Sequence, residues 1–164
     1  MAPDGGFPWS GNRALRWPDF QGPPPDGGQE AARTAYGLFY GWRCRGPSFE
    51  FQVTAAFLTR KSWVKGAILR DSAESRRVLK HEQTHFDLAE THARRMRQSF
   101  QALPDPCGQT DEQLSALAQR LIREEKAAQQ RYDAETGHGL VTAKQSEWDR
   151  AVARQLAALA GTKR

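Results

Sequence analysis

The sequence predicts an α+β fold in which a small N-terminal antiparallel sheet is followed by three helices. Between residues 34 and 58, aromatic and β-branched residues alternate with polar ones, which is typical of half-buried strands. From residue 72 onward, apolar residues recur every three or four positions, which is typical of helices with one buried face. The 164 residues suffice for one domain with a core and are too few for two ordinary ones, so we expect a single domain over 1–164.

The first 31 residues are rich in glycine and proline, and we expect this segment to be largely irregular or extended. Within it, Leu15, Trp17 and Phe20 are large apolar side chains that a free tail would not need. We therefore expect a short strand there, packed on the body of the domain.

A β-hairpin is expected from the two aromatic-rich segments at residues 34–43 and 48–58, because Gly46 and Pro47 supply a turn between them. A short extended piece at residues 62–64 comes before the helices. The first helix is expected over residues 72–103.

Capping residues mark the ends of the helices. Asp71 and Glu74 provide an N-cap and its partner for the first helix, and Thr110 and Gln113 open a second helix in the same way. The glycines after residue 136 end the second helix. The third helix is expected over residues 142–160 on apolar spacing.

Charge and hydropathy exclude two classes of partner. The net charge is +5, but the 24 basic residues are scattered among 19 acidic ones, so we expect no nucleic-acid partner. No apolar run approaches the ~20 residues of a membrane-spanning helix, so we expect no membrane span. The sequence does not indicate an oligomeric state.

The two cysteines, Cys44 and Cys107, fit neither a CxxC redox site nor a thiolate zinc site. They form one disulfide if the protein is exported, or two unrelated thiols if it is not. The first residues show no basic-then-apolar leader, so either the protein stays inside the cell or a leader was removed earlier.

The most informative motif is HEQTH at residues 81–85, inside the first predicted helix. His81 and His85 lie four residues apart and point the same way, so both rings can reach one metal ion. Glu82 between them is suited to deprotonate a metal-activated water. This pattern indicates a zinc hydrolase.

A catalytic zinc ion normally takes a third protein ligand. On an unbroken helix, His92 is about 10 Å further along the axis than His85, and Glu90 is rotated by about 140° from it. We therefore read His92 as a surface or supporting residue and Glu90 as a brace. His138, in a glycine-flanked turn, is the favoured third ligand, and Glu135, Glu90 and His92 are weaker candidates for the same role.

Other side chains have expected supporting roles. Tyr132, close in sequence to the histidine turn, is a candidate to stabilise the oxyanion, and a place in the core would suit it equally. Asp87, Asp133 and Glu90 are candidates for the carboxylate that orients a histidine ligand. The strand at residues 49–57 offers an edge to which an extended substrate can add.

Several segments, spread in order over nearly the whole chain, carry a resemblance to one family. They are Trp17-Pro18-Asp19-Phe20-Gln21-Gly22, residues 32–37, Ser62-Trp63-Val64, residues 79–90 and residues 132–139. They resemble a bacterial family catalogued as a domain of unknown function and described as predicted secreted zinc-dependent proteases. The resemblance implies a zincin-like fold, zinc held by His81, His85 and His138, Glu82 as the catalytic residue, and a secreted or periplasmic location.

The combined expectation is a metallopeptidase that holds one Zn²⁺ ion and hydrolyses peptide bonds of a peptide or protein substrate, with Glu82 as general base. A second possibility is a non-catalytic binding module in which zinc is structural or vestigial. A third is a zinc amidase that acts on a non-peptide or cell-wall amide.

Overall fold

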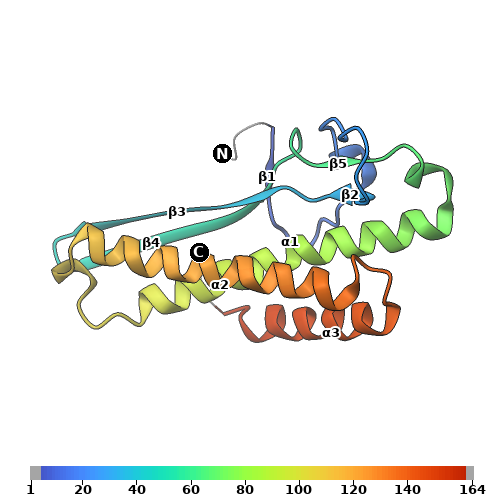
Figure 1. The fold of residues 1–164 in the computed structure, drawn as a ribbon. Helices are drawn as coiled ribbons and strands as arrows, with labels where there is room; N and C mark the ends of the chain where they lie inside the picture. The colour runs from blue at the N-terminus through green and yellow to red at the C-terminus, as the bar shows by residue number, and fades with distance from the viewer. Residues whose placement is uncertain (1–4, 162–164) are drawn as a thin grey trace.

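The computed structural model describes residues 5–161 (Figure 1). Its strands are β1 (Phe7–Pro8), β2 (Ala32–Arg33), β3 (Tyr36–Arg45), β4 (Ser48–Phe57) and β5 (Trp63–Val64). Its helices are α1 (Ser72–Gln101), α2 (Asp111–Thr136) and α3 (Thr142–Ala158), with short 3₁₀ turns η1 (Trp17–Asp19), η2 (Ile68–Arg70) and η3 (Pro106–Gly108). The expected mixed α/β fold, with small antiparallel sheets before three helices, is confirmed.

The predicted hairpin forms the larger sheet. β3 and β4 pair antiparallel from Tyr36 opposite Phe57 to Arg45 opposite Ser48, and β1 adds to the other side of β4. The turn places Gly46 at φ +58°, a conformation that favours glycine. From Phe51 to Ala55 alternate residues of β4 are buried, which fits the period-two pattern of the sequence, and Ala56 and Phe57 are buried as well.

The N-terminal segment differs from its prediction. Residues 17–19 form the 3₁₀ turn η1 rather than a strand, since Pro18 fixes a turn conformation there, and the strand of this region is β1. The expected packing on the body is confirmed, because Leu15 and Phe20 belong to the core. The backbone N–H of Leu15 also donates to Gln83 of α1 at 2.6 Å.

Helix α1 lies at the centre of the molecule, with the sheets on one side and α2 and α3 packed on other parts of its surface (Figure 1). Asp71 caps it by accepting hydrogen bonds from Ala73 N and Glu74 N, each at 2.9 Å. Phe100 stacks on Phe51 of β4 with ring centroids 3.9 Å apart. The helix is thus anchored to the sheet near its C-terminal end.

Helix α2 runs back along α1 (Figure 1). It begins with the predicted capping box of Thr110 and Gln113 and ends at Gly137, which adopts the left-handed conformation. A tight turn at residues 137–141 then leads into α3. This turn brings the end of α2 and the start of α3 beside the first half of α1.

Cys44 and Cys107 form a disulfide, which joins the end of β3 to η3 in the connection between α1 and α2. Of the two outcomes left open by the sequence, the structure therefore has the bonded one. Within residues 5–161, none of the helices combines the length and apolar character that a bilayer crossing requires.

Candidate metal centre

The two histidines of the HEQTH motif converge on one point. His81 is 3% exposed, and its Nε2 lies 3.1 Å from the Nε2 of His85. Asp133 of α2 completes a triangle, because its Oδ1 lies 3.1 Å from His81 Nε2 and 2.9 Å from His85 Nε2. Three potential ligand atoms from two helices thus share one small region.

These distances fit a small divalent cation. A tetrahedral zinc ion with bonds of about 2.0–2.1 Å separates its ligand atoms by about 3.3 Å. The three separations among His81, His85 and Asp133 lie within a few tenths of an ångström of that value. Two imidazole nitrogens and a carboxylate oxygen are also a donor set that zinc accepts.

The far nitrogens of both rings are held by glutamine side chains. His81 Nδ1 lies 3.0 Å from Gln145 Oε1, and His85 Nδ1 lies 2.6 Å from Gln129 Oε1. An amide oxygen only accepts, so these contacts favour a proton on each Nδ1, and a ring protonated there can offer its Nε2 lone pair to an ion. The two glutamine contacts therefore favour the tautomer that a metal ligand requires.

Glu82 points into the same cleft from α1. Its Oε2 accepts a hydrogen bond of 2.6 Å from the backbone N–H of Thr34, and the Thr34 hydroxyl donates to the Glu82 carbonyl at 3.1 Å. The side chain is 4% exposed. The residue that follows β2 thus fixes the position of this carboxylate.

The turn after α2 packs directly on His81. A Cβ atom built on Gly139 would meet His81 Cβ at 3.1 Å, and the φ of +83° at Gly139 also favours glycine. His138 itself has φ +53°, which a residue with a side chain rarely adopts. Its ring is exposed, with Nδ1 3.6 Å from Asp133 Oδ1, and lies at the rim of the site.

Ligand atoms of His81, Asp133 and His138 lie within 4.8 Å of one another. His138 is therefore near the site, as expected, but Asp133 lies closer to the two motif histidines. The sequence interpretation gave Asp133 only a supporting role.

The acidic side chains of Glu135, Glu90 and Asp87 have partners outside the metal centre. Glu135 accepts a hydrogen bond of 2.8 Å from Trp148, and Glu90 binds Arg94 at 2.9 Å, so neither braces a histidine of the motif. Asp87 accepts hydrogen bonds from Trp9 and Gln83 rather than from a ligand.

His92 is 7% exposed, so the expectation of a surface residue is wrong. The face of α1 that carries His92 is covered, because α2 and α3 pack on this helix as well as the sheet does. His92 is not among the residues that line the histidine cleft.

Tyr132 also differs from its expected role as an oxyanion donor. Its side chain is fully buried, and its hydroxyl donates to the His81 carbonyl at 3.1 Å and contacts Gln145. Burial raises the pKa of this phenol. Tyr132 therefore holds the backbone of His81 from the core and does not face the cleft, which agrees with the expected alternative of a core tyrosine.

The electrostatics of the site favour a cation. Burial would lower the pKa of His85, but its hydrogen bond to Asp133 and the charge of Glu82 outweigh this effect, and the pKa is raised. Burial would raise the pKa of Asp133, but the hydrogen bonds from both histidines hold it well below its usual range. An ionised Asp133 therefore lies between the two rings at neutral pH.

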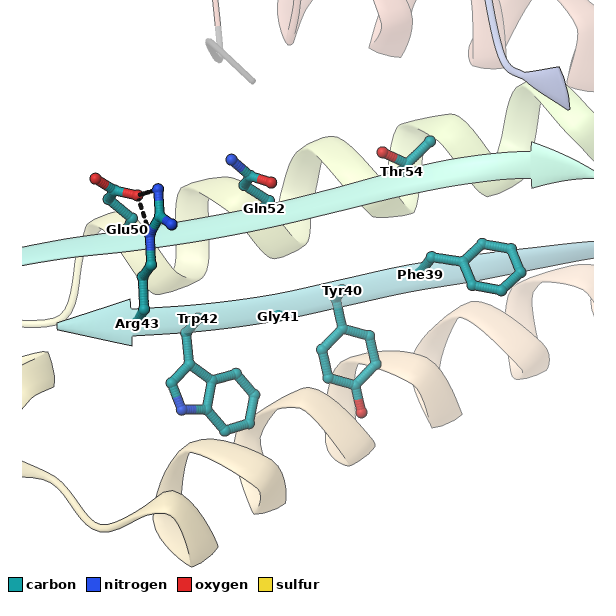
Figure 2. Close-up of a pocket in the computed structure, with 8 residues that line it drawn as sticks. All are labelled: Phe39, Tyr40, Gly41, Trp42, Arg43, Glu50, Gln52 and Thr54. Atoms are coloured by element: carbon teal, nitrogen blue, oxygen red, sulfur yellow. Dashed lines mark hydrogen bonds and ion pairs between the residues drawn. The ribbon is translucent and has the colours of Figure 1, made fainter. Parts of the chain in front are cut away.

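The site opens into a cleft of about 630 Å³. Its walls are the segment 29–34, the first half of α1 and the turn that carries His138 and Leu140. A second hollow, of about 400 Å³, lies on the hairpin, where Arg43 pairs with Glu50, while the rings of Tyr40 and Trp42 extend from the other side of β3 (Figure 2). The histidine cleft is the larger of these two and holds the candidate chemistry.

Three supporting residues of this site were not predicted: Thr34, Gln129 and Gln145. A signal for one of them was present, because Gln129 and Asp133 lie four residues apart and so share one face of a helix. Only the packing of α2 and α3 on α1 decides that these faces meet the histidines.

Comparisons with known proteins bear on the family. No curated protein and no solved structure matches the chain. A family described as "Bacterial protein of unknown function (DUF922)" matches residues 14–139, which include α1, most of the cleft and His138. This match extends over most of the sequence, and the chain belongs to this bacterial family.

Proposed function

We propose that the protein is a zinc-dependent hydrolase of peptide bonds with a zincin-like site. The observation that carries this proposal is the convergence of His81 Nε2, His85 Nε2 and Asp133 Oδ1 within 3.1 Å of one another, with Glu82 in the same cleft. The HEQTH spacing on a buried, capped helix supports it further.

His81, His85 and Asp133 would hold the ion, in a site whose size and donor atoms suit zinc. When bound, zinc lowers the pKa of a water molecule toward ~7 and polarises a carbonyl group. His138 then borders the open side of the site, where its ring is exposed to a substrate. This assignment replaces His138 by Asp133 as the third ligand.

Glu82 would be the general base. It accepts a proton from the attacking water and passes it to the leaving amine. The Thr34 N–H bond to Oε2 fixes the carboxylate for this transfer, because it holds one oxygen in place. The exposed ring of His138 is a suitable donor to the developing oxyanion.

The backbone of β2 suits an extended peptide. Lys65 N donates to Ala31 O on the β5 side at 2.9 Å, and Thr34 N donates to Glu82 on the other side. Because peptide groups alternate in an antiparallel pair, those of Ala32 face the cleft. We propose that these groups pair with a substrate strand.

β4 was expected to provide that edge. β4 pairs with β3 along its whole length and with β1 only at Ala56 and Phe57, but none of its residues lines the histidine cleft. The strand that borders the cleft is β2.

The test is Glu82→Gln, with zinc content measured by atomic emission and hydrolysis measured on a peptide library. We expect full zinc content and a loss of hydrolysis of about 100-fold or more. Glu112→Gln, at an exposed position of α2, is the charge-matched control and should behave as the wild type.

Other results would redirect the proposal. Equal hydrolysis by wild type and Glu82→Gln would contradict a role for Glu82 as base. Zinc binding without hydrolysis of any substrate would indicate a binding module, and cleavage of purified peptidoglycan but not of peptides would indicate an amidase.

A further inference from the structure

Two buried chains of hydrogen bonds lead away from the histidines, one through α2 and one through α3. We propose that Glu125 and Asp149 are positioning residues that act through Gln129 and Gln145 to fix His85 and His81 as Nε2 metal ligands. The expected effect of these residues on zinc binding rests on the proposed function.

The first chain is complete within the protein. His85 Nδ1 faces Gln129 Oε1 at 2.6 Å, and Gln129 Nε2 donates to Glu125 Oε1 at 2.9 Å. The same Glu125 oxygen accepts from the Tyr36 hydroxyl at 2.6 Å. Gln129 Nε2 also donates to the His85 carbonyl at 3.0 Å, so the amide contacts both ends of this histidine.

The second chain repeats this design on α3. His81 Nδ1 faces Gln145 Oε1 at 3.0 Å, and Gln145 Nε2 donates to Asp149 Oδ1 at 2.8 Å. The Thr84 hydroxyl donates to the same Asp149 oxygen at 2.6 Å. In both chains the glutamine and the acid are four residues apart, so one helix face presents them together.

The carboxylates are needed because the side-chain amide of glutamine can face a histidine with either its oxygen or its NH₂ group. Turned by 180°, it would present its NH₂ group to the histidine Nδ1 and so stabilise the tautomer with the proton on Nε2. That tautomer has no lone pair for the metal. A carboxylate accepts only, so it draws the NH₂ group toward itself and leaves the amide oxygen for the ring.

The burial of Glu125 argues for such a role. The residue is 2% exposed, and Gln129 is 8% exposed. A buried carboxylate is strongly unfavourable unless it is paired or hydrogen-bonded, and an apolar side chain would avoid that cost. The hydrogen bonds from Tyr36 and Gln129 offset the cost of burying the Glu125 carboxylate, and they fix its orientation.

The test uses Glu125→Gln and Asp149→Asn, which keep the shape of each side chain but remove its acceptor-only character. Imidazole ¹⁵N NMR of the metal-free full chain is recorded at a pH at which both rings are neutral. We expect Glu125→Gln to change the Nδ1 signal of His85 and leave that of His81 unchanged, and Asp149→Asn to do the reverse. Glu124→Gln, at an exposed neighbour of Glu125, is the matched control and should leave both rings unchanged.

The consequence is measured as zinc affinity, which we expect to fall by about 10- to 100-fold in each variant and to stay constant in Glu124→Gln. Unchanged protonation and unchanged affinity in both variants would overturn the inference. If Glu125→Gln does not fold, Asp149→Asn decides, because Asp149 is less buried. A wild type that binds no zinc would instead refute the proposed function, while the NMR comparison would still test the two chains.

Discussion

Asp133 is the residue whose role most changes the interpretation of the site. It comes from α2, 48 positions after His85, yet its carboxylate lies within 3.1 Å of both motif histidines. His138 follows five residues later and reaches only the rim. The two residues therefore give opposite expectations on substitution.

We expect Asp133→Ala to lower zinc affinity by at least about tenfold, because it removes a ligand atom from the triangle. His138→Ala should keep its zinc and lose hydrolytic rate instead. Zinc content and zinc titration of the two variants check this. Loss of zinc in His138→Ala with retention in Asp133→Ala would restore His138 as the third ligand.

His92 gives a pH dependence of stability. Burial lowers its pKa from 6.5 to about 4, helped by the charge of Arg95. Between these two values the unfolded chain binds more protons than the folded one, so the free energy of unfolding falls as the pH falls. The loss over this window is at most about 3 kcal/mol.

Urea unfolding of wild type and His92→Gln at several pH values between 4 and 6.5 isolates this contribution. The difference in stability between the two proteins should shift in favour of the variant as the pH falls. A constant difference across the range would contradict the assignment to His92.

At the scale of elements, the helices were predicted well because their ends carry local signals. The caps at Asp71, Thr110 and Gly137 lie where the sequence indicated. The polar core of α1 was not predicted, and its buried Thr84, Glu90 and Arg97 show why. An amphipathic pattern assumes one buried face, whereas α1 is covered by a sheet and by two helices.

The turn between α2 and α3 allows a sharp test. Gly139→Ala would place a methyl group 3.1 Å from His81 Cβ in a left-handed conformation. Gly27 has a similar φ of +84° with open space around it, so Gly27→Ala carries only the conformational cost of about 1 kcal/mol.

We expect Gly139→Ala to destabilise the protein by at least about 1 kcal/mol more than Gly27→Ala does, and to weaken zinc binding as well. Urea denaturation and zinc titration of both variants measure this. Equal losses of stability in the two variants would mean that a methyl group at position 139 does not clash with His81.

At the scale of the whole molecule, the hairpin and the three helices followed from the sequence, but the short strands β1 and β2 and the contacts between distant segments did not. His81, Glu82 and His85 were identifiable because one helix holds them. Asp133 and the two glutamines required the docking of α2 and α3, which depends on packing over the whole core. The sequence left the cysteine pairing open because the pairing depended on whether the protein is exported.

The disulfide closes a segment of 63 residues between Cys44 and Cys107. By the loss of chain entropy in the unfolded state, a loop of this length contributes about 4 kcal/mol. We expect the double variant Cys44→Ala, Cys107→Ala to lose about that much stability in thermal or urea unfolding. Its zinc affinity should remain, because the disulfide is at the opposite end of α1 and α2 from the histidines (Figure 1).

The position of that disulfide also affects where the native protein unfolds locally. The disulfide ties the end of β3 to the connection between α1 and α2, so we expect partial unfolding of the oxidised chain to begin at the opposite end of the two helices, where the histidines lie. Amide hydrogen exchange should accordingly be fastest in the first turns of α1 and the last turns of α2 when metal is absent. A ligand that binds only the closed form lowers the population of the open form as its free concentration rises. A bound ion would therefore slow amide exchange at this end of the two helices, and its removal would restore the exchange.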